Sequence, residues 1–173
     1  MLISPEMNAA LNEQVGNEFA ASIQYVCIAA HFDLEGLPFL AKHFYRQSEE
    51  EREHAMRFVK YVVDAGERLE IPNIPAPTAR FSSAEEAVQL SLDNELLVTR
   101  QINQLVDLAI RQNDHTSKNF LEWFVNEQLE EVSSMDQLLR MVRRAGENGL
   151  LFVENYLMTR QLGARVAVAA SHG

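Results

Sequence analysis

The feature that most constrains the fold is a pair of ionisable residues inside an apolar helical stripe at residues 40–65. At a period of 3.6 residues, Glu51 and His54 share a helix face with mostly apolar side chains, namely Leu40, Phe44, Gln47, Ala55, Phe58, Val62 and Ala65. A buried carboxylate is strongly destabilising unless it is ion-paired or binds a metal. The stripe therefore predicts a partner for Glu51 in the protein interior.

Glycine and proline, apart from Gly16, fall at the ends of long runs free of both, which predicts an all-α protein. With 173 residues, 47% of them hydrophobic, we expect one domain over residues 1–173. The sequences Ser4-Pro5-Glu6 and Ser83-Ala84-Glu85-Glu86 are typical helix starts. Predicted helices span about 5–33, 38–65, 83–111, 115–145 and 150–161, with a frayed tail from Gly163 to Gly173.

The connection at residues 67–82 is too rich in proline to be helical. Extended at ~3.3 Å per residue it spans about 50 Å, whereas a helix of ~28 residues is about 42 Å long. The helices on either side of it can therefore run parallel in a four-helix bundle.

Three further glutamates, Glu18, Glu95 and Glu131, lie on the predicted inner faces of the other long helices. For residues 115–145 the rest of that face is Leu121, Phe124, Val125, Gln128, Val132, Met135, Leu139 and Val142. Glu18 precedes Glu51 by 33 residues, and Glu95 precedes Gln128 by the same interval. A shift of 77 positions maps Glu18, Glu51 and His54 onto Glu95, Gln128 and Glu131, so we expect all six to meet at mid-height of the bundle.

Four carboxylates then meet at a single level, together with one imidazole and one amide. The like charges of the carboxylates repel one another unless cations lie between them. A single such glutamate is more often a residue that reaches solvent from the core face, but four at matched depth favour a metal site. Oxygen ligands with one imidazole favour iron(II) or manganese(II) over structural zinc. Iron is the stronger hypothesis because its oxidation state can change, so we expect a dinuclear iron site.

Other residues near these positions admit two interpretations. Tyr25 either serves the site, through a hydrogen bond or an electron, or is an ordinary core tyrosine, and Trp123 is similarly ambiguous. Glu50, Glu127 and Glu130 flank the predicted ligands and form either a third, weaker metal position or ordinary exposed glutamates. No role is assigned to Cys27, His31, His43, His115 or His172.

The net charge of −10 disfavours nucleic acid as a partner, because phosphate binding requires clustered lysine and arginine. No run of eighteen apolar residues is present, and the N-terminus lacks the features of a signal peptide. We therefore expect a cytoplasmic protein without a membrane partner.

From about Ser4 to Leu157 the sequence resembles the bacterial non-haem ferritins. The resemblance rests on Glu18 with Tyr25, on Glu95, and on two segments, Glu50-Glu51-Arg52-Glu53-His54-Ala55 and Trp123-Phe124-Val125-Asn126-Glu127-Gln128-Leu129-Glu130-Glu131. It implies a ferritin-like four-helix bundle with a long B–C crossover and a short fifth helix. It also implies a homo-oligomeric cage of twenty-four subunits, whose fifth helices meet at fourfold axes. Such a cage would oxidise iron(II) with dioxygen or peroxide and store it as hydrated ferric oxide.

Carried over residue by residue, the resemblance assigns Glu18 and His54 to a first iron, Glu51 as a bridge, and Glu95 with Glu131 to a second iron. Gln128 lies beside the second iron, and the third position comprises Glu50, Glu127 and Glu130.

Two departures from related families matter. Haem-containing bacterioferritin has a second Glu-x-x-His and a methionine after the bridging glutamate, where this chain has Gln128-x-x-Glu131 and Arg52, so no haem is expected. Lys118 and Leu121 stand where animal ferritins carry the carboxylates of their threefold iron channels, which disfavours that uptake route.

Three other functions fit less well. DNA-protecting mini-ferritins build their site between subunits and lack a fifth helix. Rubrerythrins need a cysteine-ligated iron, which a single cysteine cannot provide. A metal-free helical interaction protein would be distinguished by its failure to bind iron(II).

Overall fold

The computed structural model describes residues 2–171, with side chains described to Leu162. Its helices are α1 (Pro5–Leu34), α2 (Pro38–Asp64), α3 (Ala84–Arg111), α4 (His115–Ala145) and α5 (Leu150–Ser171), with a 3₁₀ turn at Glu147–Gly149 before α5. No strand occurs in the described part of the chain. The all-α, four-helix prediction is confirmed, and the first four helices end within one or two residues of the predicted bounds.

The fifth helix is the exception. It was predicted to end at about Gln161, but it continues through Gly163 to Ser171. The prediction of a frayed tail is therefore wrong for residues 163–171, and its last two residues lie outside the described chain. A single glycine costs a helix only about 1 kcal/mol relative to alanine, which is too little to end one by itself.

Local capping explains where the helices begin. The Ser4 hydroxyl accepts a hydrogen bond from the Met7 amide at 3.0 Å, and the Ser83 hydroxyl accepts one from the Glu86 amide at 3.0 Å. The Glu86 carboxylate accepts in turn from the amide of Ser82, at 2.6 Å, so the predicted capping box closes one residue earlier than expected.

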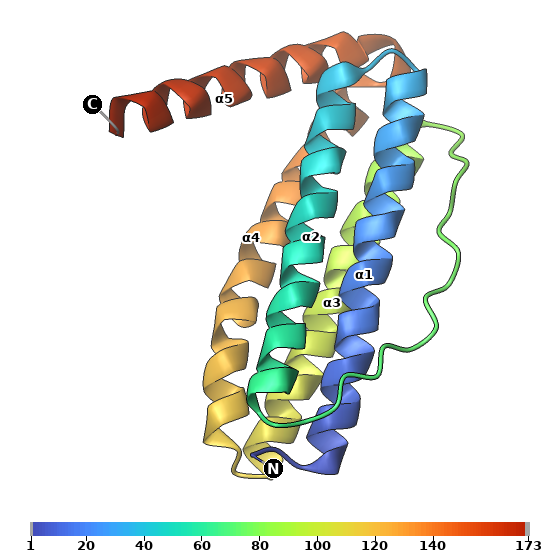
Figure 1. Cartoon of the computed structure of the whole chain (residues 1–173). Coiled ribbons are helices and arrows are strands. Elements are labelled where there is room, and N and C mark those ends of the chain that lie inside the picture. The colour runs from blue at the N-terminus through green and yellow to red at the C-terminus, as the bar shows by residue number, and fades with distance from the viewer. Residues whose placement is uncertain (1, 172–173) are drawn as a thin grey trace.

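The crossover at residues 67–82 runs along the length of the bundle, so that α2 and α3 are parallel, as predicted (Figure 1). One face of α1 holds it in place. Gln24 exchanges two 2.8 Å hydrogen bonds with the backbone of Thr78, and Asn12 accepts from the Glu70 amide at 2.7 Å. Between them, Pro72 packs on Gly16 so closely that a Cβ there would lie 2.5 Å from the proline ring. Gly16 thus provides the close approach that the crossover requires.

The core consists of two apolar clusters stacked along the bundle. One includes Phe32, Phe44 and Met135, and the other includes Met7, Phe58 and Leu121. On each of the four long helices the two clusters are separated by about two to four turns. The interval holds Glu18, Glu51, His54, Glu95, Gln128 and Glu131. The fold therefore places a polar layer between two apolar ones.

Most side chains of the predicted inner faces are buried, but Val125 is 41% exposed, so the prediction that it lies on the inner face of α4 is wrong. The inward stripe of α4 passes through Leu121, Phe124, Gln128 and Glu131, at helical spacings of three and four residues. Val125 lies one position off this stripe.

Among the described helices, none combines the length and apolar character needed to cross a lipid bilayer.

Helix α5 lies across the end of the bundle at which α2 begins (Figure 1). Leu150, Val153 and Leu157 pack into the first apolar cluster, whereas Leu151 and Phe152 are 73% and 80% exposed. The N-cap position of α2 is Leu37, whose side chain cannot accept a hydrogen bond.

A buried carboxylate from α5 supplies the missing cap. Glu154 is 7% exposed, and its two oxygens accept hydrogen bonds from the amides of Phe39 at 2.9 Å and Leu40 at 2.7 Å. A carboxylate at a helix N-terminus is favoured by both these hydrogen bonds and the helix dipole. Glu154 therefore joins α5 to the first turn of α2.

We expect Glu154→Ala to release α5 from the bundle, because it leaves one buried and one part-buried amide without acceptors, at a cost of about 1–3 kcal/mol. Hydrogen exchange measured by mass spectrometry should show faster exchange at Phe39, Leu40 and α5 than in the parent protein. Glu49→Ala, at an exposed position on α2, is the matched control. Unchanged protection of α5 in Glu154→Ala would show that apolar packing alone holds the helix.

Candidate metal centre

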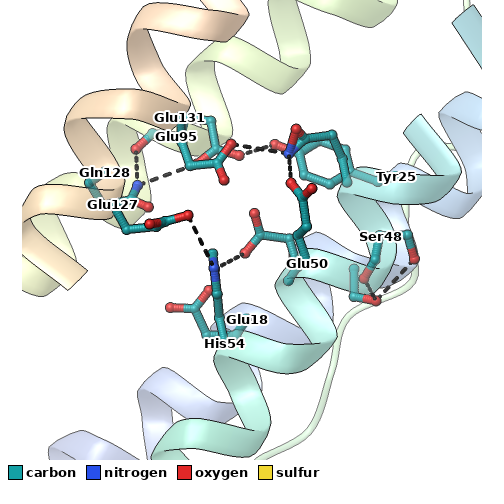
Figure 2. A network of polar contacts seen from close by, with 12 residues as sticks. Glu18, Tyr25, Ser48, Glu50, His54, Glu95, Glu127, Gln128 and Glu131 are labelled. Carbon is teal, nitrogen blue, oxygen red and sulfur yellow. Dashed lines mark hydrogen bonds and ion pairs between the residues drawn. The ribbon is translucent and has the colours of Figure 1, made fainter. Parts of the chain in front are cut away.

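The polar layer gathers the predicted site residues from all four long helices. Glu18 comes from α1, His54 from α2, Glu95 from α3, and Gln128 and Glu131 from α4 (Figure 2). Glu51 also comes from α2. All six are nearly excluded from solvent, with exposed fractions between 0% for Glu18 and 6% for Glu131. Their convergence follows from the matched depth at which each residue occurs along its helix.

Three sets of side chains each place one potential ligand atom per residue within 4.8 Å of the others. The first set is Glu18, Glu51 and His54; the second is Glu51, Glu95 and Glu131; the third is His54, Glu127 and Glu131. Glu51 is common to the first two sets. The geometry therefore offers two adjacent positions that share one carboxylate, and a third position beside them.

Hydrogen bonds occupy some of the carboxylate oxygens and leave others free. Glu18 accepts from the amide nitrogen of Gln14 at 2.8 Å through Oε1, and Oε2 of Glu51 lies 3.1 Å from Nδ1 of His54. The other oxygens, Glu18 Oε2 and Glu51 Oε1, are buried and have no hydrogen-bond partner among the described residues. Buried acceptors without partners are rare, and a bound cation would satisfy both of them.

The second set is held by a different group of donors. The Tyr25 hydroxyl donates to Glu95 Oε1. The amide nitrogen of Gln128 lies 3.2 Å from the Glu95 carbonyl oxygen and 3.3 Å from its Oε2. Glu131 Oε2 accepts from the amide nitrogen of Gln47 at 3.0 Å. Gln128 thus acts here as a donor to Glu95.

The electrostatics of the layer disfavour several ionised carboxylates at once. Burial, and then the charge of Glu51, raise the pKa of Glu18 well above its usual value. Burial, and then the charge of Glu95, raise the pKa of Glu51 well above its usual value. The same two causes raise the pKa of Glu131 to about 8. Burial followed by Glu95 raises the pKa of Tyr25, so the phenol remains a hydrogen-bond donor.

The potential ligand atoms of the layer are carboxylate oxygens and one imidazole nitrogen, and they suit a divalent cation. Oxygen-rich sites with a single nitrogen ligand are typical of iron(II) and manganese(II), as the sequence predicted. Two cations in the first two positions would bring positive charge to the free oxygens of Glu18 and Glu51. The residues therefore fit a dinuclear centre.

The three flanking glutamates, Glu50, Glu127 and Glu130, differ in burial and in their distance from the ligand sets. Oε1 of Glu127 is 3.9 Å from Nε2 of His54 (Figure 2), and this residue belongs to the third set. Glu50 is half-buried and accepts from the amide nitrogen of Gln47 at 3.1 Å. Glu130 is exposed and belongs to none of the three sets. The structure thus brings two of the three beside the centre.

Sequence reasoning missed the supporting residues. Gln14 and Gln47 are both buried, and each lies four residues before a glutamate of the layer, which was the only available signal. The sequence alone does not decide between a core role and a site role for Trp123. Its ring lies edge-on to His54, with centroids 5.4 Å apart, and its face carries the Arg57 guanidinium at 3.9 Å, so it covers the imidazole from outside.

Comparison with known proteins gives a consistent family. A family model described as the ferritin-like domain matches residues 8–145. The sequence is 42% identical over 167 residues to ferritin BfrB of Mycobacterium tuberculosis strain ATCC 35801, covering 96% of this chain and 92% of that protein. It is 34% identical over 164 residues to a bacterial non-heme ferritin of Staphylococcus aureus USA300, covering 95% and 97%. An open-pore ferritin from the archaeon Archaeoglobus fulgidus is a structural neighbour, with a TM-score of 0.87 and 32% identity over 90% of this chain and 96% of that one.

We expect the metal-free protein to lose stability as the pH rises. The pKa of Glu131 is about 8 in the folded protein against an ordinary value of 4.5, so between these values the folded state binds more protons than the unfolded state. The free energy of unfolding then falls with rising pH, by up to about 1.4 kcal/mol per pH unit for each such group. Thermal unfolding midpoints measured from pH 5 to 8.5 would check this.

Glu131→Gln should flatten that dependence and raise the midpoint at pH 8, whereas Glu49→Gln, at an exposed position, should leave it unchanged. Adding Zn(II), which is redox-inert, should restore the stability of the parent protein at pH 8. A midpoint that rises steadily from pH 5 to 8.5 without metal would contradict the assigned burial cost.

Proposed function

Because this chain belongs to the ferritin family of iron-storage proteins, we propose that its polar layer is a ferroxidase centre that oxidises iron(II) before storage. The observation that carries the proposal is the pair of adjacent ligand sets that share Glu51 and leave two buried carboxylate oxygens free. A site for one structural cation would need only one of these sets. Two adjacent sets suit a reaction that removes one electron from each of two ions.

The ligand sets support a different role for each residue of the layer. Glu18 and His54 would bind the first iron, Glu51 would bridge, and Glu95 with Glu131 would bind the second. Gln128 would orient Glu95 through its amide, and Tyr25 would do so through its hydroxyl. All of them lie on rigid helices, so the two substrate ions would be held close together without rearrangement of the backbone.

The proposed reaction oxidises iron at the expense of dioxygen or peroxide. With dioxygen, two iron(II) ions lose one electron each, and the oxygen molecule takes up two electrons and two protons to give hydrogen peroxide. The carboxylate-rich layer favours this direction because anionic ligands stabilise the higher charge of iron(III). The ferric product would leave the centre and be stored as hydrated ferric oxide.

We expect the parent protein to bind two iron(II) ions tightly per chain in an anaerobic titration and to oxidise them on exposure to air. Glu51→Gln should slow the initial oxidation by at least about 10-fold, since replacing even an outer-shell partner of a metal ligand typically costs 10–100-fold. The rise in ferric absorbance reports the rate, and Glu49→Gln is the control. Oxidation no faster than in buffer alone would overturn the ferroxidase proposal.

A third metal position at His54, Glu127 and Glu131 is also proposed, flanked by Glu50. The arrangement separates the two outer glutamates, because Glu127 belongs to the set and exposed Glu130 does not. Among the positions carried over from the family, Glu130 is therefore the weakest candidate.

Glu127→Gln should reduce the number of iron(II) ions bound per chain, or weaken the last of them by about 10-fold, whereas Glu130→Gln should have less than a twofold effect. Anaerobic calorimetric titration of both variants would measure this difference. Equal effects would mean that Glu130 turns inward when metal is bound.

The family supports assembly into an oligomeric cage, and we propose twenty-four copies in the cytoplasm. The exposed apolar side of α5, at Leu151 and Phe152, is suited to contact with other copies. Particle size measured on the same sample as the iron titration would test the number of copies.

The residues at the positions of the animal threefold channel are not suited to iron uptake. Leu121 is fully buried in the core, so it cannot line an uptake channel, and Lys118 pairs with Glu122 at 2.8 Å.

A further inference from the structure

Two buried glutamines contact the layer, and each donates to a carboxylate of a different ligand set. Gln14 is 2% exposed, and its amide nitrogen lies 2.8 Å from Glu18 Oε1. Gln47 is 3% exposed, and its amide nitrogen lies 3.0 Å from Glu131 Oε2. Glu18 belongs only to the first set, whereas Glu131 belongs to the second and third.

The orientation of each amide is fixed by another contact. The oxygen of Gln14 accepts a 3.3 Å hydrogen bond from the side-chain amide of Asn17, so its nitrogen must face Glu18. The nitrogen of Gln47 also lies 3.1 Å from Glu50 Oε2. A primary amide has two N–H groups, so Gln47 can donate to Glu131 and Glu50 together.

These contacts leave one oxygen of each ligand free to bind a cation. With Oε1 of Glu18 occupied by Gln14, its buried Oε2 is the atom without a partner. With Oε2 of Glu131 occupied by Gln47, its Oε1 is left for the second position. A fixed carboxylate loses less conformational entropy when a metal binds, so the donor strengthens the position that it supports.

We propose that Gln14 and Gln47 are positioning residues on opposite sides of Glu51. Gln14 supports the first metal position through Glu18, and Gln47 supports the second through Glu131, which also belongs to the third set, and couples it to Glu50. The inference rests on the proposed two-metal centre and adds to it the residues that make its halves independently adjustable. Neither glutamine needs to touch the metal. Gln47 is the only described side chain that hydrogen-bonds both Glu131 and Glu50.

The test is a calorimetric titration of the metal-free, assembled protein with Zn(II), which probes binding without oxidation. Gln47→Met, close in volume to glutamine, should weaken one of the two binding steps by about 10–100-fold and leave the other within twofold. Gln14→Met should weaken the other step. The double variant should weaken both by the same factors as the single variants.

The outcomes separate the two proposals. If the parent protein binds fewer than two Zn(II) ions per chain, the two-metal centre itself is wrong. If the parent binds two and Gln47→Met leaves both steps unchanged, or weakens both equally, the positioning roles are wrong and the centre stands.

A second measurement does not depend on the variants folding. In a crystal structure of the parent protein with Zn(II), the amide nitrogen of Gln47 should remain within hydrogen-bond distance of Glu131, and that of Gln14 within such distance of Glu18. Amides turned away from these ligands would overturn the inference.

Discussion

The structure depends on the repulsion among carboxylates that are confined between two apolar clusters. Glu18, Glu51 and Glu95 are each at most 1% exposed, and the clusters above and below them contain rings such as Phe44 and Phe58. In this low-dielectric setting an unpaired negative charge is expensive, and several of them together are more so. The fold can retain them because the apolar layers provide stability and because cations can neutralise the charge.

The arrangement also depends on how the chain sets helix register. All six residues of the layer meet only if four helices of similar length begin at matched ends, and the crossover allows α2 and α3 to run in the same direction (Figure 1). Gln24 and Asn12 hold that crossover against α1, and Gly16 lets it approach closely. Contacts on the outer side of α1 therefore help to set the height at which the carboxylates of the layer meet.

Much of this could be predicted from the sequence because helical periodicity is a local property. The stripe containing Glu51 and His54 was enough to predict their burial, and the repeated spacing predicted that other helices would supply Glu18, Glu95 and Glu131 at the same level. The hydrogen bonds that orient these ligands could not be predicted. The contact of Gln47 with Glu131 joins residues 84 positions apart, and its geometry depends on the packing of α2 against α4.

The twofold repeat predicts equivalence between the halves, and the structure shows why they differ. The counterpart of Glu51 is Gln128, whose amide donates to Glu95, so only one carboxylate is shared between the two ligand sets. The counterpart of His54 is Glu131, so the first set has two carboxylates and an imidazole, and the second has three carboxylates. More negative charge surrounds the second position, and an ion there would be held more strongly as its charge increases. The two differences between the halves, Gln128 for Glu51 and Glu131 for His54, would thus give the two proposed positions different affinities for the same ion.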